Sequence, residues 1–245
     1  MTKFNQRLKV LLFLPLLLGS VFLLFKYSRA QFSDSETVLG NSIQVGVWGG
    51  ETTPTPVPVN PGDVVINELM WMGSSKGASD EWIELRNTTG GTINISGWQL
   101  TKWVKSGTDH EEFMLTIPGG STIPAGGFFL IAQFPSGAPG SALNVEPDVI
   151  TTSVVLSNTD LQIKLFVSNW DSGGTLIDTA GDKSTPLKGE HETRPPKKFY
   201  SMERSNTFGD GAAASSWYTA TVSVGFDPGE NIENRGTPKS VNSTP

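Results

Sequence analysis

Short runs of apolar residues, interrupted by polar residues at strand-compatible spacing, repeat along the chain from residue 63 onwards. The first two runs, 63–71 and 80–87, are rich in β-branched and aromatic residues and are joined by the Gly/Ser stretch 73–77. This pattern predicts two strands and a connecting loop. The same criteria predict strands near 63–71, 80–87, 93–103, 111–117, 127–134, 149–156, 161–168, 174–179, 198–204 and 217–222.

Gly-rich turns separate these runs, and no segment after Phe25 keeps an apolar period of 3.6 residues. Short strands divided by such turns favour an all-β sandwich over a parallel α/β sheet. The chain has no cysteine, so the sandwich must depend on its core rather than on disulfides. The predicted core residues are Ile83, Leu85, Ile95, Trp98, Leu100, Phe129, Ile131, Leu161, Ile163 and Leu165.

Beyond the strand pattern, a series of motifs follows a defined order: Val64–Trp71, Asp80–Asn87, Ile93–Leu100, Ile123–Ile131, Leu156–Leu165, Leu176–Asp178, Ser201–Arg204, Ser216–Tyr218, and Gly236–Pro238 with Asn242. This succession resembles the lamin tail domain, an immunoglobulin-like β-sandwich found in nuclear lamins and in many bacterial surface proteins. The closing turn departs from the family pattern at Lys239, where the family has Gly. The positions that match the family motif include Asn67, Glu68, Glu81, Trp82, Glu84 and Trp98.

The resemblance implies an immunoglobulin-like β-sandwich over residues 62–243. It also implies an interaction or structural module, not an enzyme.

The first 30 residues have a different character. Basic residues within 3–9 precede an apolar run over 10–25, and Ser28-Arg29-Ala30 then places small residues where signal peptidase reads them. This pattern predicts a secretory signal peptide cleaved between Ala30 and Gln31. The alternative is a retained hydrophobic helix that anchors the chain in a membrane, although the apolar run is shorter than the ~20 residues that span a bilayer comfortably.

Two segments connect this N-terminal helix to the sandwich. Residues 31–46 resemble the segment that follows the signal peptide in camelysin-like biofilm-matrix proteins. Residues 51–61 alternate proline with small or β-branched residues, which favours an extended spacer. The predicted organisation is therefore a signal peptide or membrane anchor at 1–30, a spacer at 31–61 and a sandwich domain at 62–243.

The charge of the chain bears on its partners. Residues 1–30 hold five of the 18 basic side chains and none of the 24 acidic ones, so residues 31–245 have a formal charge of −11. A surface of this sign repels a phosphate backbone, so nucleic acid is not a favoured partner. The basic cluster Arg194–Lys198 lies in a Pro-rich stretch and is interpreted as a solvated loop.

Acidic residues on the first two strands are the main candidates for chemistry. Glu68 and Glu84 could face each other across adjacent antiparallel strands, with Arg86 placed to neutralise them and with Asp80 and Glu81 close by in sequence. A structural cross-strand network is favoured over a catalytic pair, because general acid–base catalysis also needs a partner group and a pocket. Catalytic, cofactor-binding and metal-binding residues are therefore all predicted to be absent.

Other sites receive less support. His110 and His191 have neither zinc-ligand spacing nor a triad context. Calcium remains open at two Gly-containing loops, although Asp and Asn are also ordinary turn residues. The residues of these loops are Asp171, Asp178 and Asp182 in one, and Asn206 and Asp210 with Gly209 and Gly211 in the other.

Aromatic residues leave one question open. Exposed tryptophans would suit stacking on sugar rings or contacts with proteins, whereas sandwich cores also accommodate tryptophan. The residues concerned are Trp71, Trp82, Trp103, Trp170, Trp217 and Tyr218.

The sequence thus predicts a non-enzymatic bacterial protein, secreted or attached to the cell surface, that binds another protein or a polymer of the cell envelope. A structural component of the extracellular matrix is the first alternative, and a metal-dependent hydrolase built on the acidic strands is the second.

Overall fold

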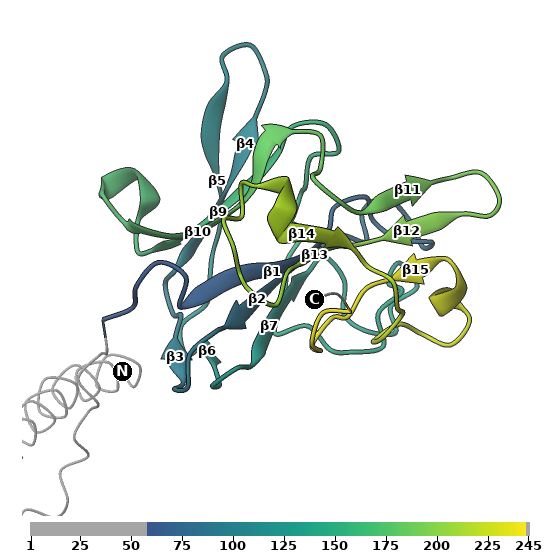
Figure 1. The fold of residues 1–245 in the computed structure, drawn as a ribbon, viewed down its shortest axis with the longest axis horizontal. Coiled ribbons are helices and arrows are strands. Elements are labelled where there is room, and N and C mark those ends of the chain that lie inside the picture. Colours follow the sequence, from purple (N-terminus) through teal and green to yellow (C-terminus); the bar gives the residue numbers. More distant parts are fainter. Residues whose placement is uncertain (1–57, 244–245) are drawn as a thin grey trace, which may run out of the picture. The chain divides into compact units, whose positions relative to one another are not determined.

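A computed structural model of the protein describes residues 58–243, which form a β-sandwich (Figure 1). The larger sheet has six strands in the order β14-β13-β1-β2-β7-β8. Their bounds are β1 Val64–Met70, β2 Trp82–Asn87, β7 Phe128–Ala132, β8 Val149–Ile150, β13 Met202–Arg204 and β14 Trp217–Thr219. The second sheet has the order β10-β9-β4-β5. Its strands are β4 Gln99–Val104, β5 His110–Thr116, β9 Leu161–Val167 and β10 Thr175–Ser184.

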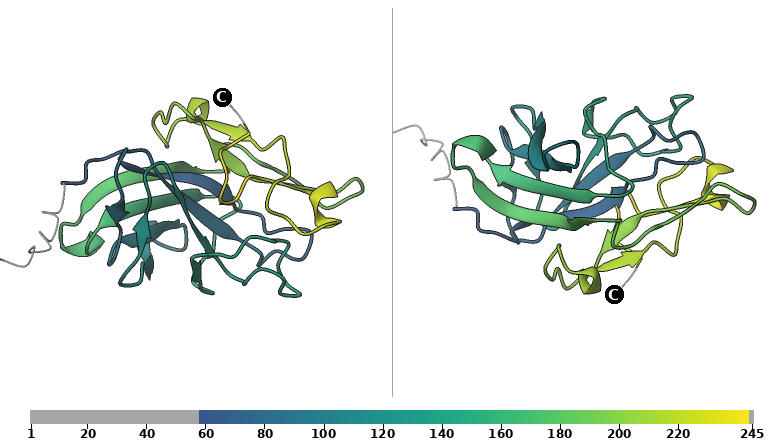
Figure 2. Two further views of the ribbon diagram at one scale, coloured as in Figure 1. Left: turned by 90° about the horizontal axis from the view of Figure 1, so that it is seen from below. Right: turned by 90° about the horizontal axis from the view of Figure 1, so that it is seen from above.

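Two small sheets complete the described part of the chain. One pairs β3 (Ile93–Asn94) with β6 (Thr122–Ile123), and the other has the order β11-β12-β15. This second small sheet extends beyond one end of the larger sheets (Figure 2). Its strands are β11 Glu190–Glu192, β12 Lys198–Tyr200 and β15 Asn234–Arg235.

Helical structure in residues 58–243 is limited to three short 3₁₀ helices, η1 Trp170–Ser172, η2 Ala214–Ser216 and η3 Glu230–Ile232. No helix in this part of the chain is long and apolar enough to cross a membrane. The predicted all-β, immunoglobulin-like fold is therefore confirmed for these residues. The predictions for the N-terminal helix, the Ala30–Gln31 cleavage site and residues 31–57 lie outside the described residues.

A single apolar cluster joins the two large sheets. Each residue that the sequence predicted for the core is buried, including Trp98. Strand β1 is buried at every position, which distinguishes it from a strand with one solvated face. One face of β1 packs in the core, so a further part of the chain must cover the other face.

Several predicted strands differ in extent. The run 93–103 divides into β3 and β4, because Gly97 has a positive φ of 76° and turns the chain between two sheets. The run 198–204 likewise divides at Ser201 into β12 and β13, which belong to different sheets. Strand β8 ends at Ile150, so most of the predicted strand 149–156 is loop. The first two errors share one cause, since alternation predicts extended backbone but not the sheet that each part joins.

One irregular position within strand β10 depends on close packing of the backbone. Gly181 lies in an irregular part of the β9–β10 pairing, has φ of 88°, and would place a Cβ atom 2.3 Å from the carbonyl oxygen of Leu161. Gly97 has a similar φ of 76° but open space around it.

We expect Gly181→Ala to destabilise the domain more than Gly97→Ala. Both substitutions incur the left-handed strain of ~1–2 kcal/mol, but only Gly181→Ala adds a clash with backbone atoms. Urea unfolding followed by tryptophan fluorescence measures the difference. Gly119→Ala is the control, since Gly119 has neither a positive φ nor close neighbours. Equal losses at Gly97 and Gly181 would show that packing around Gly181 is unimportant.

Candidate functional site

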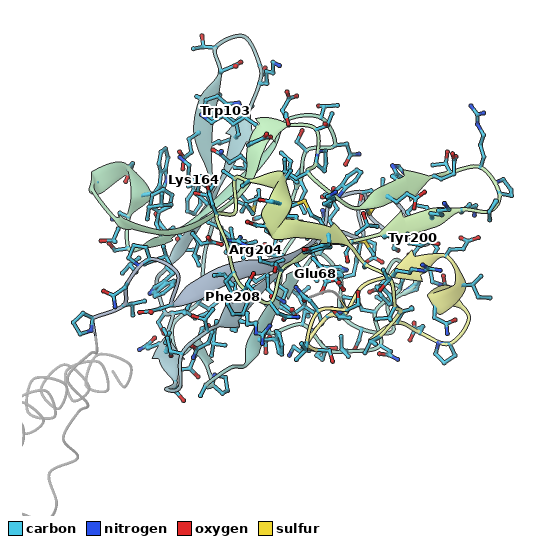
Figure 3. The ribbon with its side chains drawn as sticks, viewed as in Figure 1. Glu68, Trp103, Lys164, Tyr200, Arg204 and Phe208 are labelled. Atoms are coloured by element: carbon cyan, nitrogen blue, oxygen red, sulfur yellow. The ribbon has the colours of Figure 1, made fainter. Side chains whose placement is uncertain are left out.

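Three glutamates lie side by side at the centre of the six-stranded sheet. Glu68 on β1 is the register partner of Glu84 on β2 and of Glu203 on β13. All three side chains are fully buried. A register shift between Ile66 and Glu68 places Asn67 in an irregular part of β1 beside them. Figure 3 labels Glu68 near the middle of the view, among the side chains of the described domain. We call Glu68, Glu84 and Glu203 the glutamate cluster.

The C-terminal segment covers this cluster. Residues 236–243, which we call the clasp, return to the middle of the six-stranded sheet (Figure 1). The backbone N–H of Thr237 donates to Glu68 Oε1 over 2.9 Å, and the hydroxyl of Ser201 donates to the same oxygen. The clasp therefore supplies donors to buried oxygens that solvent does not reach.

The other two carboxyl groups also receive donors from the clasp. The backbone N–H of Lys239 donates to Glu84 Oε2, and Asn67 Nδ2 donates to Glu84 Oε1 over 2.8 Å. The N–H and hydroxyl of Ser243 both donate to Glu203 Oε2, over 3.0 and 2.6 Å. Every member of the glutamate cluster thus contacts the clasp.

Asn242 fixes the end of the clasp. Its Nδ2 donates to the backbone oxygen of Arg204 over 2.6 Å, and its Oδ1 accepts from Asn67 Nδ2 over 2.8 Å. The closing turn with Asn242, which the sequence marked as a family feature, therefore connects the clasp to β1 and β13. The substitution at Lys239 leaves this connection in place, because Lys239 adopts a positive φ of 59°.

The hydrogen bonds of the glutamate cluster also depend on where its protons lie. The hydroxyl of Thr237 lies 3.1 Å from Glu68 Oε2 and 2.9 Å from Glu203 Oε1, yet it has one proton to donate. A proton on Glu68 allows this carboxyl group to donate to the hydroxyl, which leaves the hydroxyl proton for Glu203. Burial raises the pKa of Glu68 well above its usual range, and the charges of Glu203 and Glu84 raise it further. Burial also raises the pKa of Glu84, to about 8, against the lowering effect of its hydrogen bonds.

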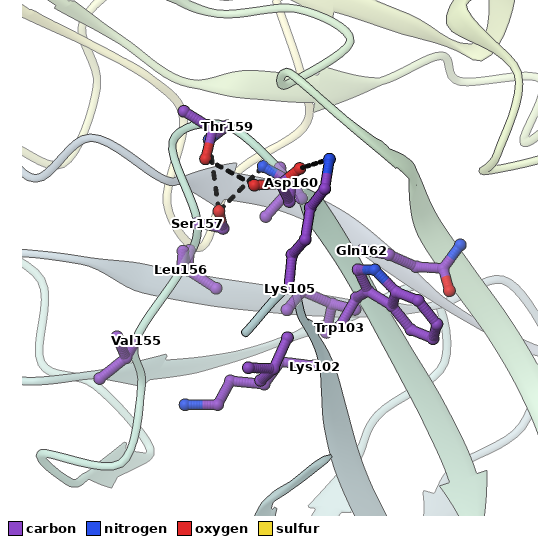
Figure 4. A pocket seen from close by; sticks show the side chains of 12 residues that line it. Lys102, Trp103, Lys105, Val155, Leu156, Ser157, Thr159, Asp160 and Gln162 are labelled. Atoms are coloured by element: carbon purple, nitrogen blue, oxygen red, sulfur yellow. Dashed lines mark hydrogen bonds and ion pairs between the residues drawn. The ribbon is translucent and has the colours of Figure 1, made fainter. Parts of the chain in front are cut away.

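A separate, open pocket lies at one end of the four-stranded sheet (Figure 4). It has a volume of about 280 Å³ and lies between the last residues of β4, the first residues of β9 and the loop 155–160. The carboxylate of Asp160 forms an ion pair with Lys105 over 3.2 Å and accepts from the hydroxyl of Thr159 over 2.8 Å. These contacts with Thr159 and Lys105 lower the pKa of Asp160. We call this the Trp103 pocket.

Trp103 of β4 contributes the aromatic surface of this pocket. The Nζ atom of Lys183 lies 3.7 Å from the centroid of its ring. Among the tryptophans that the sequence left open, Trp71, Trp82 and Trp217 are buried, whereas Trp103 is partly exposed, as is Trp170. The structure therefore assigns the first three to packing, whereas Trp103 lines the Trp103 pocket.

The architecture and these sites can be compared with known families. The family model for the Lamin Tail Domain matches residues 58–184, more than half of the 245-residue chain. The chain belongs to the lamin tail domain family. No curated protein matches it. Lamin tail domains are immunoglobulin-like domains without catalytic activity.

The lamin tail domain match ends at the last residue of β10. It includes Glu68 and Glu84, whereas Glu203 and the whole clasp follow it in sequence. The fold nevertheless continues without a break, because β13 pairs directly with β1. The structure thus adds the strands β11–β15 and the clasp to the part of the lamin tail domain that the family match covers, and two of these strands, β13 and β14, extend the six-stranded sheet.

The motif residues of this lamin tail domain occupy two environments. Trp82 and Trp98 are buried in the apolar core, and Asn67, Glu68 and Glu84 belong to the network under the clasp. Glu81 accepts from the N–H of Leu156 over 3.0 Å, and burial raises its pKa to about 7.

The neighbouring Asp80 accepts from the hydroxyl of Ser74 and from the N–H of Ala142 over 2.7 Å. Asp80 and Glu81 therefore hold the loops that carry Ala142 and Leu156 against the start of β2. The prediction that Glu68 and Glu84 are cross-strand partners is confirmed.

Arg86 acts on the glutamates through its charge and not through a direct contact. Its charge is among the effects that lower the pKa of Glu84. No ion pair joins Arg86 to Glu84 within residues 58–243; instead Arg86 Nη1 donates to Asn206 Oδ1 over 2.9 Å. Its guanidinium lies 5.3 Å from the ring centroid of Phe128 and 5.0 Å from that of Phe208. Arg86 follows Glu84 by two residues along β2, at the strand end that meets the loop containing Asn206. The clasp takes the place beside Glu84 that the sequence had suggested for a cation.

A buried ion pair that the sequence did not suggest joins the two large sheets. The guanidinium of Arg204 on β13 forms a two-pronged pair with the carboxylate of Asp178 on β10, with both N–O distances 3.2 Å. Asp178 also accepts from the N–H of Ile66 over 2.8 Å. Arg204 donates further to the oxygen of Gly209 over 2.6 Å. The calcium loops that the sequence left open are thus partly occupied by a cationic side chain.

The remaining candidate residues lie apart from both sites. Asp210 accepts from the N–H of Ala212, as turn residues do, and the stretch Arg194–Lys197 is exposed. His110 and His191 are both exposed, on β5 and β11. Within residues 58–243 no group of three or more His, Asp or Glu side chains has a geometry that could hold a metal ion.

Stability should fall as the pH rises from about 5 to about 8. The folded domain holds protons on Glu68 and Glu84 that the unfolded chain, with ordinary glutamate pKa values, releases above about pH 4.5. Each carboxyl group can contribute at most about 1.4 kcal/mol per pH unit. Glu84→Gln should flatten this dependence, and should cost about 1–3 kcal/mol at low pH because its amide NH₂ meets a donor. Urea unfolding across this pH range tests both effects, and identical slopes in the two proteins would contradict them.

Thr237→Val should destabilise the domain by about 1–3 kcal/mol. The substitution keeps the shape of the side chain and the backbone N–H, but removes the hydroxyl shared by Glu68 and Glu203. Thr122→Val is the matched control, because Thr122 is an exposed strand residue. Thermal unfolding of the two variants gives the comparison, and a neutral Thr237→Val would mean that the hydroxyl does not hold the clasp.

Proposed function

We propose that the chain is a non-enzymatic, exported bacterial surface protein whose lamin tail domain binds another protein or a polymer of the cell envelope. One observation carries this proposal: the acidic residues suited to catalysis are buried beneath the clasp, whereas the open pocket offers an aromatic side chain and polar groups. The family, which is not catalytic, supports the same conclusion.

The burial of the glutamate cluster argues against the hydrolase alternative, because a substrate cannot reach these carboxyl groups. A general acid or base must come within ~2.6–3.2 Å of the atom whose proton it transfers. Glu68, Glu84 and Glu203 are completely shielded from solvent, and their nearest polar neighbours are residues of the domain itself. A substrate would have to displace the clasp, and with it the hydrogen bonds that make burial of these carboxyl groups tolerable.

A binding role agrees with the character of the surface. The Trp103 pocket combines an aromatic ring with a fixed carboxylate and an ammonium group, as small-ligand sites commonly do. The acidic charge of residues 31–245 disfavours nucleic acid as the partner. The basic and apolar pattern of residues 1–30 supports export, with the membrane contacted through that segment before cleavage, or permanently if it is retained.

A structural matrix component is the second candidate, favoured by the resemblance of residues 31–46 to the corresponding segment of camelysin-like proteins. The two functions differ in their expected behaviour after purification. A matrix component should assemble into fibres, whereas a binding protein should stay dispersed until it meets its partner.

We expect the full chain to co-sediment with isolated native cell envelopes. Protease treatment of the envelopes should abolish the interaction if the partner is a protein, and muramidase treatment should abolish it if the partner is the wall glycan. Detection should avoid a C-terminal tag, since Ser243 belongs to the clasp. Failure to sediment with any envelope preparation would refute the binding function. Release of soluble envelope fragments by the wild type but not by Glu84→Gln would instead establish a hydrolase.

A further inference from the structure

The Trp103 pocket forms where two strands separate. Pairing of β4 with β9 reaches Lys102 opposite Ile163. Beyond this point β4 stays paired with β5 on one edge, and its other edge lies alongside the loop 155–160. The pocket therefore has strand residues on one side and a loop on the other (Figure 4). Its volume of about 280 Å³ is just below the roughly 300–1,000 Å³ of ligand pockets. This size suits one or two units of a larger polymer.

The loop side of the pocket is held in one arrangement. The N–H of Asp160 donates to the hydroxyl of Ser157 over 2.9 Å, and the N–H of Thr159 donates to the same oxygen over 3.3 Å. Asp160 is in turn oriented by Lys105 and by the hydroxyl of Thr159. A polar group whose direction is fixed in advance loses little entropy when it binds a ligand.

These groups match the hydrogen-bonding needs of a sugar. A hydroxyl both donates and accepts, and the pocket offers an acceptor in Asp160 beside a donor in Lys105. The side chain of Lys105 remains 59% exposed, so its ammonium group can reach a ligand without leaving Asp160. Lys183 contacts the indole ring of Trp103, and the part of the indole that lines the pocket supplies the apolar surface on which the C–H face of a sugar ring can stack.

The charges of the pocket favour a neutral ligand over an anionic polymer. Lys105 is paired with Asp160, and Lys102 is paired with Glu112 over 3.4 Å. A polyanion would meet two lysines that are already paired and would also approach their two carboxylates. The ammonium group of Lys183 is a third cation nearby, and it lies 3.7 Å from the centroid of the Trp103 ring. The domain as a whole adds further repulsion through its acidic charge.

We propose that the Trp103 pocket binds a neutral saccharide unit of a cell-envelope polymer. This inference rests on the proposed binding function and names its ligand class and its site. Trp103 provides the stacking surface, Asp160 accepts from a sugar hydroxyl, and Lys105 donates to another.

The test uses the full chain, kept in a detergent that has no sugar head group. The neutral probes are chitotriose, cellotriose and maltotriose, and the anionic probe is polyglycerol phosphate. Calorimetric titration should show binding of at least one neutral trisaccharide and weaker binding or none of the polyanion. Trp103→Ala and Asp160→Asn should each weaken the neutral interaction about tenfold or more, which corresponds to about 1.4 kcal/mol. Trp103→Phe should retain part of it.

Trp170→Ala is the matched control. Trp170 is also partly exposed but follows the opposite end of β9, so its loss should leave saccharide binding unchanged. The far-ultraviolet spectrum and melting curve show whether each variant is folded. If Trp103→Ala does not fold, Asp160→Asn and Trp103→Phe still decide the question.

The results separate the inference from the function on which it rests. The saccharide proposal is wrong if no neutral trisaccharide binds, if the polyanion binds more tightly, or if the pocket variants bind like the wild type. If envelopes still retain the pocket variants, the binding function holds at another surface. If the wild type does not bind envelopes at all, the binding function itself fails.

Discussion

The structure depends on the burial of three adjacent carboxyl groups at the centre of its larger sheet. A buried carboxyl group is tolerated when protons and hydrogen-bond donors replace water. Here the clasp supplies most of those donors, from the backbone of Thr237, Lys239 and Ser243. The last residues of the domain are therefore as necessary to the central strand as the neighbouring strands are. This requirement explains why β1 is buried on both faces although it carries a glutamate and an asparagine.

The domain separates its buried chemistry from its accessible chemistry. The glutamate cluster has reactive groups but no access, and the Trp103 pocket has access but a ring and polar groups suited to binding. In many enzymes a carboxyl group with a raised pKa marks the active site. In this lamin tail domain the raised pKa of Glu84 results from burial under residues of the same chain, so it reports on stability. A raised pKa alone does not distinguish an active-site carboxyl group from a structural one, whereas the solvent exposure of the carboxyl group does.

Much of the fold and part of the site follow from the sequence. Alternation identified the core positions, and strand spacing allowed Glu68 to face Glu84, because neighbouring antiparallel strands joined by a short loop leave few choices of register. The third glutamate was not predicted, since β13 joins β1 across more than 130 residues of chain. Thr237 contacts Glu68 across a separation of 169 residues. No local pattern carries such information, although the closing turn with Asn242 did indicate that the family uses this segment.

Arg86 and Arg204 show why charge pairing is hard to read from sequence. Arg86 lies two residues from Glu84 and yet contacts Asn206 and two aromatic rings. Arg204 follows Glu203 directly, but its planar guanidinium forms a two-pronged pair with Asp178 on the other sheet.

A guanidinium in that geometry ties two sheets together and has few donors left for a second carboxylate. Among residues 58–243, Arg204 is the only basic side chain that is buried, whereas five acidic side chains are buried: Glu68, Asp80, Glu81, Glu84 and Glu203. Cations are too few to neutralise them, so hydrogen-bond donors and protons must take that role. A clasp rich in backbone N–H and hydroxyl groups is the solution that this imbalance requires, and it makes the stability of the domain respond to pH.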